Sequence, residues 1–158
     1  MISNEHRAWV SSFIDSGATQ SAKLVVDGRD INVPGHETGC FIGGCLFDEV
    51  IPDMDIYQQE IFGPVLSVVR IPDYDSAVEL INRHECGNGT AIFTRDGDTA
   101  RSFGDDVQVG IVGINVPIPV PMAFHCFSGW KRSLFGSLNM HGPDGVRFFT
   151  RMKSITSR

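Results

Sequence analysis

The residues that could do chemistry are few, and they match no common catalytic motif. His125 lies beside Cys126, a thiol next to a base, but adjacent residues of an extended chain point to opposite faces. Asp53, Asp55 and Glu60 could serve acid or base chemistry, although composition favours solvent-facing carboxylates. The chain has no GxGxxG dinucleotide loop, no P-loop and no GxSxG elbow. These patterns alone predict no catalytic residue.

The cysteines do not form a recognisable metal or disulfide pattern. No CxxC pair or dense framework occurs among Cys40, Cys45, Cys86 and Cys126, so reduced thiols are expected. A zinc site that combines them with His84 or His125 stays a possible alternative, but no pair has the spacing of zinc-finger ligands. We therefore predict no metal.

Composition is that of an ordinary globular protein. Of 158 residues, 42% are hydrophobic and 20% charged, and the net charge is -6. No run of Lys or Arg could follow a phosphate backbone, which argues against nucleic acid as a partner. Charges interrupt every apolar stretch before the roughly 18 residues of a bilayer span, and no targeting segment is recognisable. We expect a soluble, intracellular protein.

The first third of the chain predicts one helix and two extended segments. Apolar residues recur at helical spacing from Glu5 to Ile14, and Gly17 supplies a stop. Lys23 to Val26 is a β-rich run that ends at a turn, and Cys40 to Val50 is expected to be extended.

The middle of the chain predicts alternating strands and helices. The first is a Val-rich strand buried on both faces, Val65 to Ile71, and the second is a helix with Asp73 as N-cap and Tyr74, Ala77, Val78 and Ile81 on one face. A strand (Thr90 to Thr94), a weaker helix (Asp98 to Val107) and a third apolar run (Val109 to Val116) follow. This order favours an α/β fold with a mostly parallel β-α-β-α-β sheet. Ligands of such sheets bind beyond the carboxyl ends of the strands.

The chain after Val116 is therefore where chemistry is expected. Pro117 to Pro121 must be a stiff extended loop, because proline fixes φ and removes a donor. The stretch from Met122 to Leu138 is rich in aromatic residues and could line an apolar tunnel, although the residues alone favour plain core. Pro143 suits the start of a helix that reaches Met152, and Lys153 to Thr156 reads as a terminal edge strand that pairs with another subunit.

Four segments resemble the aldehyde dehydrogenase superfamily. The run Gln59-Glu60-Ile61-Phe62-Gly63-Pro64-Val65 resembles its ExFGPV motif, Gly87 to Thr94 resembles the strand after the first crossover helix, and Met152 to Thr156 is similar to its oligomerisation strand. The proline-rich run from Val112 to Pro121 looks like the CoA-acylating methylmalonate-semialdehyde dehydrogenase branch. The resemblance covers about the last third of such an enzyme, so residues 1-158 would be the C-terminal part of its catalytic domain, with 151-158 as the oligomerisation strand.

The resemblance implies an enzyme that converts malonate or methylmalonate semialdehyde to acetyl-CoA or propionyl-CoA and carbon dioxide, with NAD as cofactor and CoA as co-substrate. Glu60 would hold the nicotinamide ribose and Phe62 would pack near the nicotinamide, while Asn115, Phe124 and Phe127 would wall the substrate tunnel. Lys153 to Thr156 would join copies into a homo-oligomer. The resemblance also implies the bacterial cytoplasm or, in a eukaryote, the mitochondrial matrix as the location. The catalytic cysteine and the coenzyme domain would lie upstream of Met1, which leaves no catalytic residue here.

Four positions depart from the family pattern. Gly44-Cys45 stands where Pro-Thr is usual, Cys86 replaces an aromatic residue, and Cys126 stands where serine is common. If position 86 is buried, the smaller side chain leaves a void that costs about 2 to 4 kcal/mol.

Three functions follow from these patterns. The first is a fragment of the acylating dehydrogenase that is inactive alone. The second is a non-catalytic module for assembly, and the third is part of a hydrolytic aldehyde dehydrogenase, which the run from Val116 to Pro121 disfavours.

Overall fold

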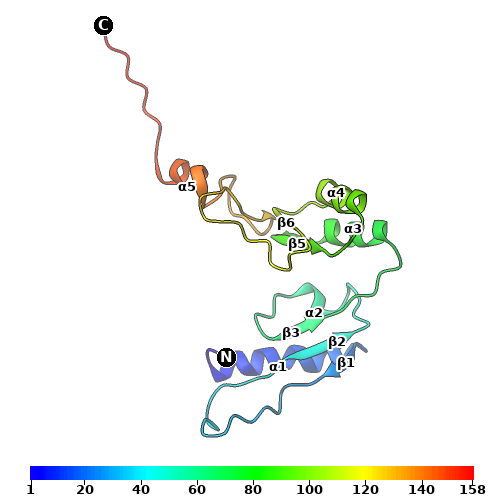
Figure 1. Cartoon of the computed structure of the whole chain (residues 1–158). Helices are drawn as coiled ribbons and strands as arrows, with labels where there is room; N and C mark the ends of the chain where they lie inside the picture. The colour runs from blue at the N-terminus through cyan, green and yellow to red at the C-terminus, as the bar shows by residue number, and fades with distance from the viewer. The chain divides into compact units, whose positions relative to one another are not determined.

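The computed structural model describes residues 1 to 158, which form two compact units. One unit comprises Met1–Ile71 and the other Pro72–Arg158. Each combines helices with short strands (Figure 1), so the predicted α/β class is confirmed. No helix of the structure has both the length and the apolar character that crossing a membrane requires.

The first unit begins with helix α1, Asn4–Thr19. Ser3 caps it by accepting a hydrogen bond from the His6 amide at 3.1 Å. The prediction that Gly17 stops the helix is wrong, because the helix continues through it. Gly17 is buried, and a Cβ there would lie 2.9 Å from Ile56 Cδ1 and 3.1 Å from Phe47 Cε1. This glycine therefore allows close packing rather than a chain turn.

A three-stranded sheet completes the first unit. Its order is β1 (Lys23–Val26), β2 (Cys45–Asp48) and β3 (Val65–Ser67), with β1 antiparallel and β3 parallel to β2. A short helix that the sequence did not predict, α2 (Asp55–Gln58), precedes β3. The core joins α1 to β2, and its largest fully buried side chains are Val10, Ile14, Phe47 and Val50.

The predicted strand from Val65 to Ile71 is shorter than expected and not buried on both faces. Only Val65–Ser67 is strand, and the Leu66 side chain is 63% exposed within this chain. The apolar run therefore predicted the strand but overestimated its burial.

The second unit contains the other strands and helices: α3 (Tyr74–Arg83), β4 (Cys86–Gly87), β5 (Gly89–Ile92), α4 (Gly97–Asp106), β6 (Ile111–Ile114), β7 (Trp130–Lys131) and α5 (Gly142–Phe149). Asp73 caps α3 as predicted, through a 2.8 Å bond from the Ser76 amide. Asp96 caps α4 in the same way, from the Thr99 amide at 2.7 Å. Phe103, Val107 and Val109 form the buried core of this unit.

The strands pair as three small sheets rather than as one parallel sheet. β5 and β6 are parallel, with Gly89 opposite Ile111 and Ile92 opposite Ile114. β4 pairs antiparallel with β7, and β3 belongs to the sheet of the first unit. The predicted β-α-β-α-β series is present in its order as β3, α3, β5, α4 and β6, but β4 and β7 were not predicted. The prediction of one continuous sheet is wrong.

The end of the chain differs from the predicted strand. Pro117 to Pro121 has neither helix nor strand, as expected, and α5 ends at Phe149, before the predicted Met152. Residues 151-158 are exposed and form no strand within the chain. A strand needs a partner for its backbone hydrogen bonds, and this segment has none within its own chain.

Candidate functional site

The loop from Gln59 to Pro64, here called the Glu60 loop, joins α2 to β3 in the first unit. Two of its residues fasten it to the core. The Ile61 side chain is buried in the cluster that includes α1. Gly63 packs against α1 so closely that a Cβ there would lie 2.7 Å from Val10 Cγ2. Only a glycine brings the loop this near to the helix.

Phe62 lies between these two anchors in an unusual conformation. Its φ is 55°, in the left-handed region that residues other than glycine rarely adopt. Its ring is 78% exposed, while its carbonyl oxygen lies 2.9 Å from His6 Nε2. The backbone turn at Phe62 therefore directs the ring away from the core and the carbonyl toward α1.

Glu60 is exposed on the same loop, and its carboxylate makes no hydrogen bond or ion pair within the chain. An ionised carboxylate is an acceptor with two oxygens, and it can bind two neighbouring hydroxyl groups at once. The loop thus presents a free acceptor and, two residues later, a free aromatic ring. This pair suits a ligand that has a diol next to a flat ring.

Asn115 lies just beyond β6, with a φ of 57°. Its Oδ1 accepts from the Thr94 amide at 3.0 Å, and its Nδ2 donates to the Thr94 carbonyl at 3.0 Å. Its own amide donates to the Ile92 carbonyl at 2.8 Å. The side chain therefore replaces a peptide group and extends the pairing of β5 with β6. One N–H of the amide remains for another acceptor.

Phe124 and Phe127 share one loop of the second unit. The Phe124 ring is 68% exposed and lies 4.5 Å from the His125 ring, while the Phe127 ring stacks on His141 at 4.5 Å. Gly142, with a φ of 66°, holds this loop, because its amide donates to the Ala123 carbonyl at 3.1 Å. Neither ring belongs to the buried core, so the interpretation of these rings as plain core is not supported for this chain.

The predicted site residues fall into separate places. Glu60 and Phe62 lie together on one loop of the first unit, and Phe124 and Phe127 on one loop of the second. Asn115 belongs to the second unit but makes its contacts with Ile92 and Thr94 rather than with either ring.

The departures from the family pattern have different surroundings. Cys45 is 3% exposed and belongs to the core of the first unit, where it accepts a hydrogen bond from the Gly28 amide at 3.2 Å. Cys86 is exposed, so the expected void at a buried position does not arise within this chain. Cys126 is also exposed. The four thiols are unpaired, and no group of three or more His, Cys, Asp or Glu side chains could hold a metal ion.

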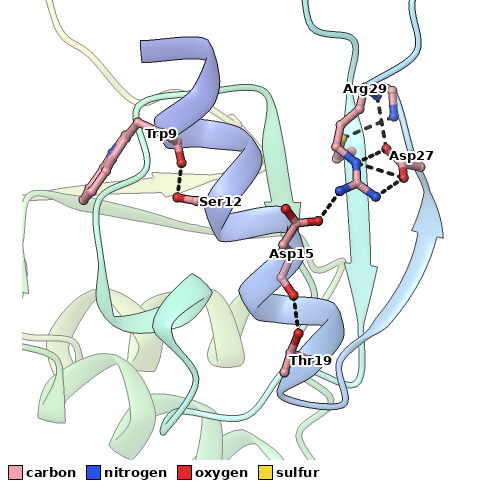
Figure 2. Close-up of polar contacts among 8 residues, drawn as sticks. Trp9, Ser12, Asp15, Thr19, Asp27 and Arg29 are labelled. Atoms are coloured by element: carbon pink, nitrogen blue, oxygen red, sulfur yellow. Dashed lines mark hydrogen bonds and ion pairs between the residues drawn. The ribbon is translucent and has the colours of Figure 1, made fainter. Parts of the chain in front are cut away.

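Sequence reasoning missed the polar contacts that brace α1. Arg29 binds Asp15 of α1 and also Asp27, the residue after β1, with its Nε 2.9 Å from Asp27 Oδ1 (Figure 2). The hydrogen bond from Arg29 lowers the pKa of Asp27, and the two carboxylates raise the pKa of Arg29. The His6 contact was missed too, since its partner is 56 residues away and no local pattern indicates it.

The comparisons with known proteins agree on one family. The aldehyde dehydrogenase family matches residues 1–155. Malonate-semialdehyde dehydrogenase of Pseudomonas aeruginosa is 62% identical over 152 residues, covering 96% of this chain and 31% of the relative. Malonate-semialdehyde dehydrogenase 1 of Bacillus licheniformis is 46% identical over 158 residues, covering 100% of this chain and 32% of the relative. The chain therefore spans about a third of the length of these relatives.

Solved structures agree with this assignment. A protein of Sinorhizobium meliloti assigned as methylmalonate-semialdehyde dehydrogenase, solved with NAD, matches with a TM-score of 0.96 and 60% identity over 100% of this chain and 32% of that one. Methylmalonate-semialdehyde dehydrogenase of Oceanimonas doudoroffii matches with a TM-score of 0.95 and 56% identity over the same shares. This chain belongs to the aldehyde dehydrogenase family.

Proposed function

We propose that this chain supplies the C-terminal third of a dehydrogenase that oxidises malonate or methylmalonate semialdehyde with NAD and CoA. The observation that carries this is the Glu60 loop, which presents an unpartnered carboxylate and an exposed ring from an anchored backbone. The names of the relatives support the choice of semialdehyde, and the NAD bound in the Sinorhizobium meliloti protein supports the cofactor.

The Glu60 loop fits the nicotinamide riboside half of NAD. The Glu60 carboxylate would accept hydrogen bonds from the two ribose hydroxyls, and the Phe62 ring would pack near the nicotinamide. NAD, when bound, supplies the hydride acceptor. The chain itself contributes orientation, because Ile61 and Gly63 fix the loop on either side of Phe62. The aldehyde-binding thiol would come from outside these residues, so none of the four cysteines is assigned to catalysis.

The second unit would form part of the substrate tunnel. Exposed rings such as Phe124, together with Phe127, would keep water from the acyl intermediate until CoA accepts it. The free N–H of Asn115 would serve as a donor at the same wall. Lys153 to Thr156, exposed and unpaired, would add as a strand to another copy of the protein.

A chimera tests the proposal. The C-terminal third of the Pseudomonas aeruginosa relative is replaced by this chain, and NADH formation from malonate semialdehyde is followed with and without CoA. We expect turnover that requires CoA as acyl acceptor. A chimera that has the circular dichroism and elution volume of the parent enzyme but shows no NAD-linked oxidation refutes the proposal, and equal turnover without CoA refutes the acylating part.

A point variant tests the cofactor loop in the same chimera. Glu60→Gln loses the charge of the acceptor, so the KM for NAD should rise about tenfold or more, since hydrogen bonds to charged groups are the strong ones. Glu79→Gln changes an exposed carboxylate of α3 and serves as the matched control, with no change in KM expected. An unchanged KM in Glu60→Gln removes Glu60 from the site.

A further inference from the structure

The Glu60 loop has a polar connection to α1. His6 Nε2 lies 2.9 Å from the Phe62 carbonyl oxygen, so the ring donates a hydrogen bond across 56 residues of sequence. His6 Nε2 is the one side-chain donor on the loop's backbone carbonyls between Gln59 and Pro64.

His6 is well placed to hold a backbone in position. It lies in the first turn of α1, and the Ser3 hydroxyl fixes its amide at 3.1 Å. Its side chain is half-buried. Val10, four residues further along the same face, is fully buried and contacts Gly63. The helix thus fixes the loop at two adjacent points, one polar and one apolar.

Phe62 needs such a restraint. A φ of 55° is unfavourable for a phenylalanine, and a ring that is 78% exposed adds little packing to compensate. Without a partner on its carbonyl, the peptide after Phe62 could relax toward the ordinary region. A relaxed peptide would reorient the Phe62 ring and, two residues earlier, the Glu60 carboxylate.

We propose that His6 is a positioning residue for the Glu60 loop, holding the Phe62 carbonyl so that Glu60 and Phe62 face the cofactor together. The role in cofactor binding rests on the proposed function, whereas the restraint of the loop does not. His6 acts through the peptide of Phe62, and no contact of His6 with the cofactor is required.

Two variants of similar size separate the hydrogen bond from packing. His6→Leu removes the donor, and His6→Gln keeps an N–H near the same distance from the backbone. Hydrogen exchange of the peptide covering residues 59-65 is measured in the full chain. We expect exchange in His6→Leu to rise about fivefold, the equivalent of one ordinary hydrogen bond, and His6→Gln to restore most of the protection. His36→Leu, the same change at a site with no contact to the loop, is the control.

The same variants in the chimera test the role in cofactor binding. His6→Leu should raise the KM for NAD about fivefold with little change in kcat, and His6→Gln should restore it. Equal exchange in His6→Leu and the unaltered chain overturns the restraint. Faster exchange with an unchanged KM overturns the positioning role, provided that Glu60→Gln raises the KM. If Glu60→Gln has no effect either, the proposed function of the loop fails, and the exchange data alone decide whether His6 holds it.

Discussion

Substitution of Gly63 by alanine should destabilise the first unit, although alanine has a lower folding entropy cost. A Cβ at this position would lie 2.7 Å from Cγ2 and 2.8 Å from Cγ1 of Val10. Both branches of Val10 face the new methyl group, and a β-branched residue in a helix has one strongly preferred rotamer. Val10 is also 0% exposed, so it cannot move aside without displacing the core. We expect a loss of about 1 to 3 kcal/mol in the free energy of unfolding.

A second substitution shows whether this clash is the cause. Val10→Ala alone removes two buried methyl groups and should cost about 2 kcal/mol. In the double variant the space vacated by Val10 receives the methyl group at position 63, so the two losses should not add. We expect a coupling free energy of about 1 to 2 kcal/mol that favours the double variant, well above the roughly 0.5 kcal/mol seen for independent sites.

The assay is urea unfolding followed by tryptophan fluorescence. In a Trp130→Phe background, Trp9 on α1 alone reports on the first unit. Gly44→Ala is the control, since a Cβ there meets nothing within 4 Å, and it should be neutral or stabilise by up to about 1 kcal/mol. If Gly63→Ala is as stable as the unaltered chain, the close contact with Val10 is not the reason for a glycine at position 63. The same conclusion follows if the losses in the free energy of unfolding of Gly63→Ala and Val10→Ala are additive.

Three further predictions concern the second unit. Gly104→Ala should stabilise α4 by about 1 kcal/mol in thermal or urea unfolding, because position 104 is exposed within the helix and a Cβ there meets no atom within 4 Å; a loss of stability would contradict this. The amide of Ser76 lowers the pKa of Asp73, so the cap contributes stability above the ordinary Asp pKa of about 4 and loses it as the pH falls through the lowered folded-state value. Asp73→Asn should keep the cap and lose this part of the pH dependence of the urea midpoint. If the urea midpoint of Asp73→Asn falls at acidic pH as it does in the unaltered chain, Asp73 is not the source of that fall. Lys131→Met should lower the free energy of unfolding by about 1 to 2 kcal/mol. The Lys131 ammonium group donates to the carbonyls of Asn82 and His84 at the end of α3, at 2.8 and 3.1 Å. An unchanged urea midpoint in Lys131→Met would show that water replaces these bonds.

The elements that the sequence predicted well are those with a local cause. Asp73 begins α3 because its side chain reaches an amide only three residues ahead, and the structure shows that bond. The proline loop after Val116 likewise follows from the backbone preferences of its residues, whereas the turn predicted at Asp27-Gly28 lies two residues later, at Arg29 and Asp30. Such features depend on residues that are neighbours in sequence, so one amino-acid sequence is enough to predict them.

Only part of the candidate site could be predicted from the sequence. The motif around Glu60 identified the loop by resemblance, but its short helix α2 and the left-handed Phe62 were not predicted. Gly17 was misread as a stop, since glycine at the end of a helix and glycine at a close helix contact look the same in sequence. Their difference lies in Phe47 and Ile56, which approach from 30 or more residues away.

The sequence by itself determined the α/β class, the β-α-β-α-β series, the Asp73 cap and the family, because each rests on local spacing or on a recognisable run of residues. The tertiary structure alone decided that the strands form three small sheets, that Asn115 pairs with Thr94, and that His6 and Val10 contact the Glu60 loop. These contacts join residues that are 20 to 56 positions apart. They form only when distant segments of the chain pack against one another, and the local preferences of a residue do not predict such packing.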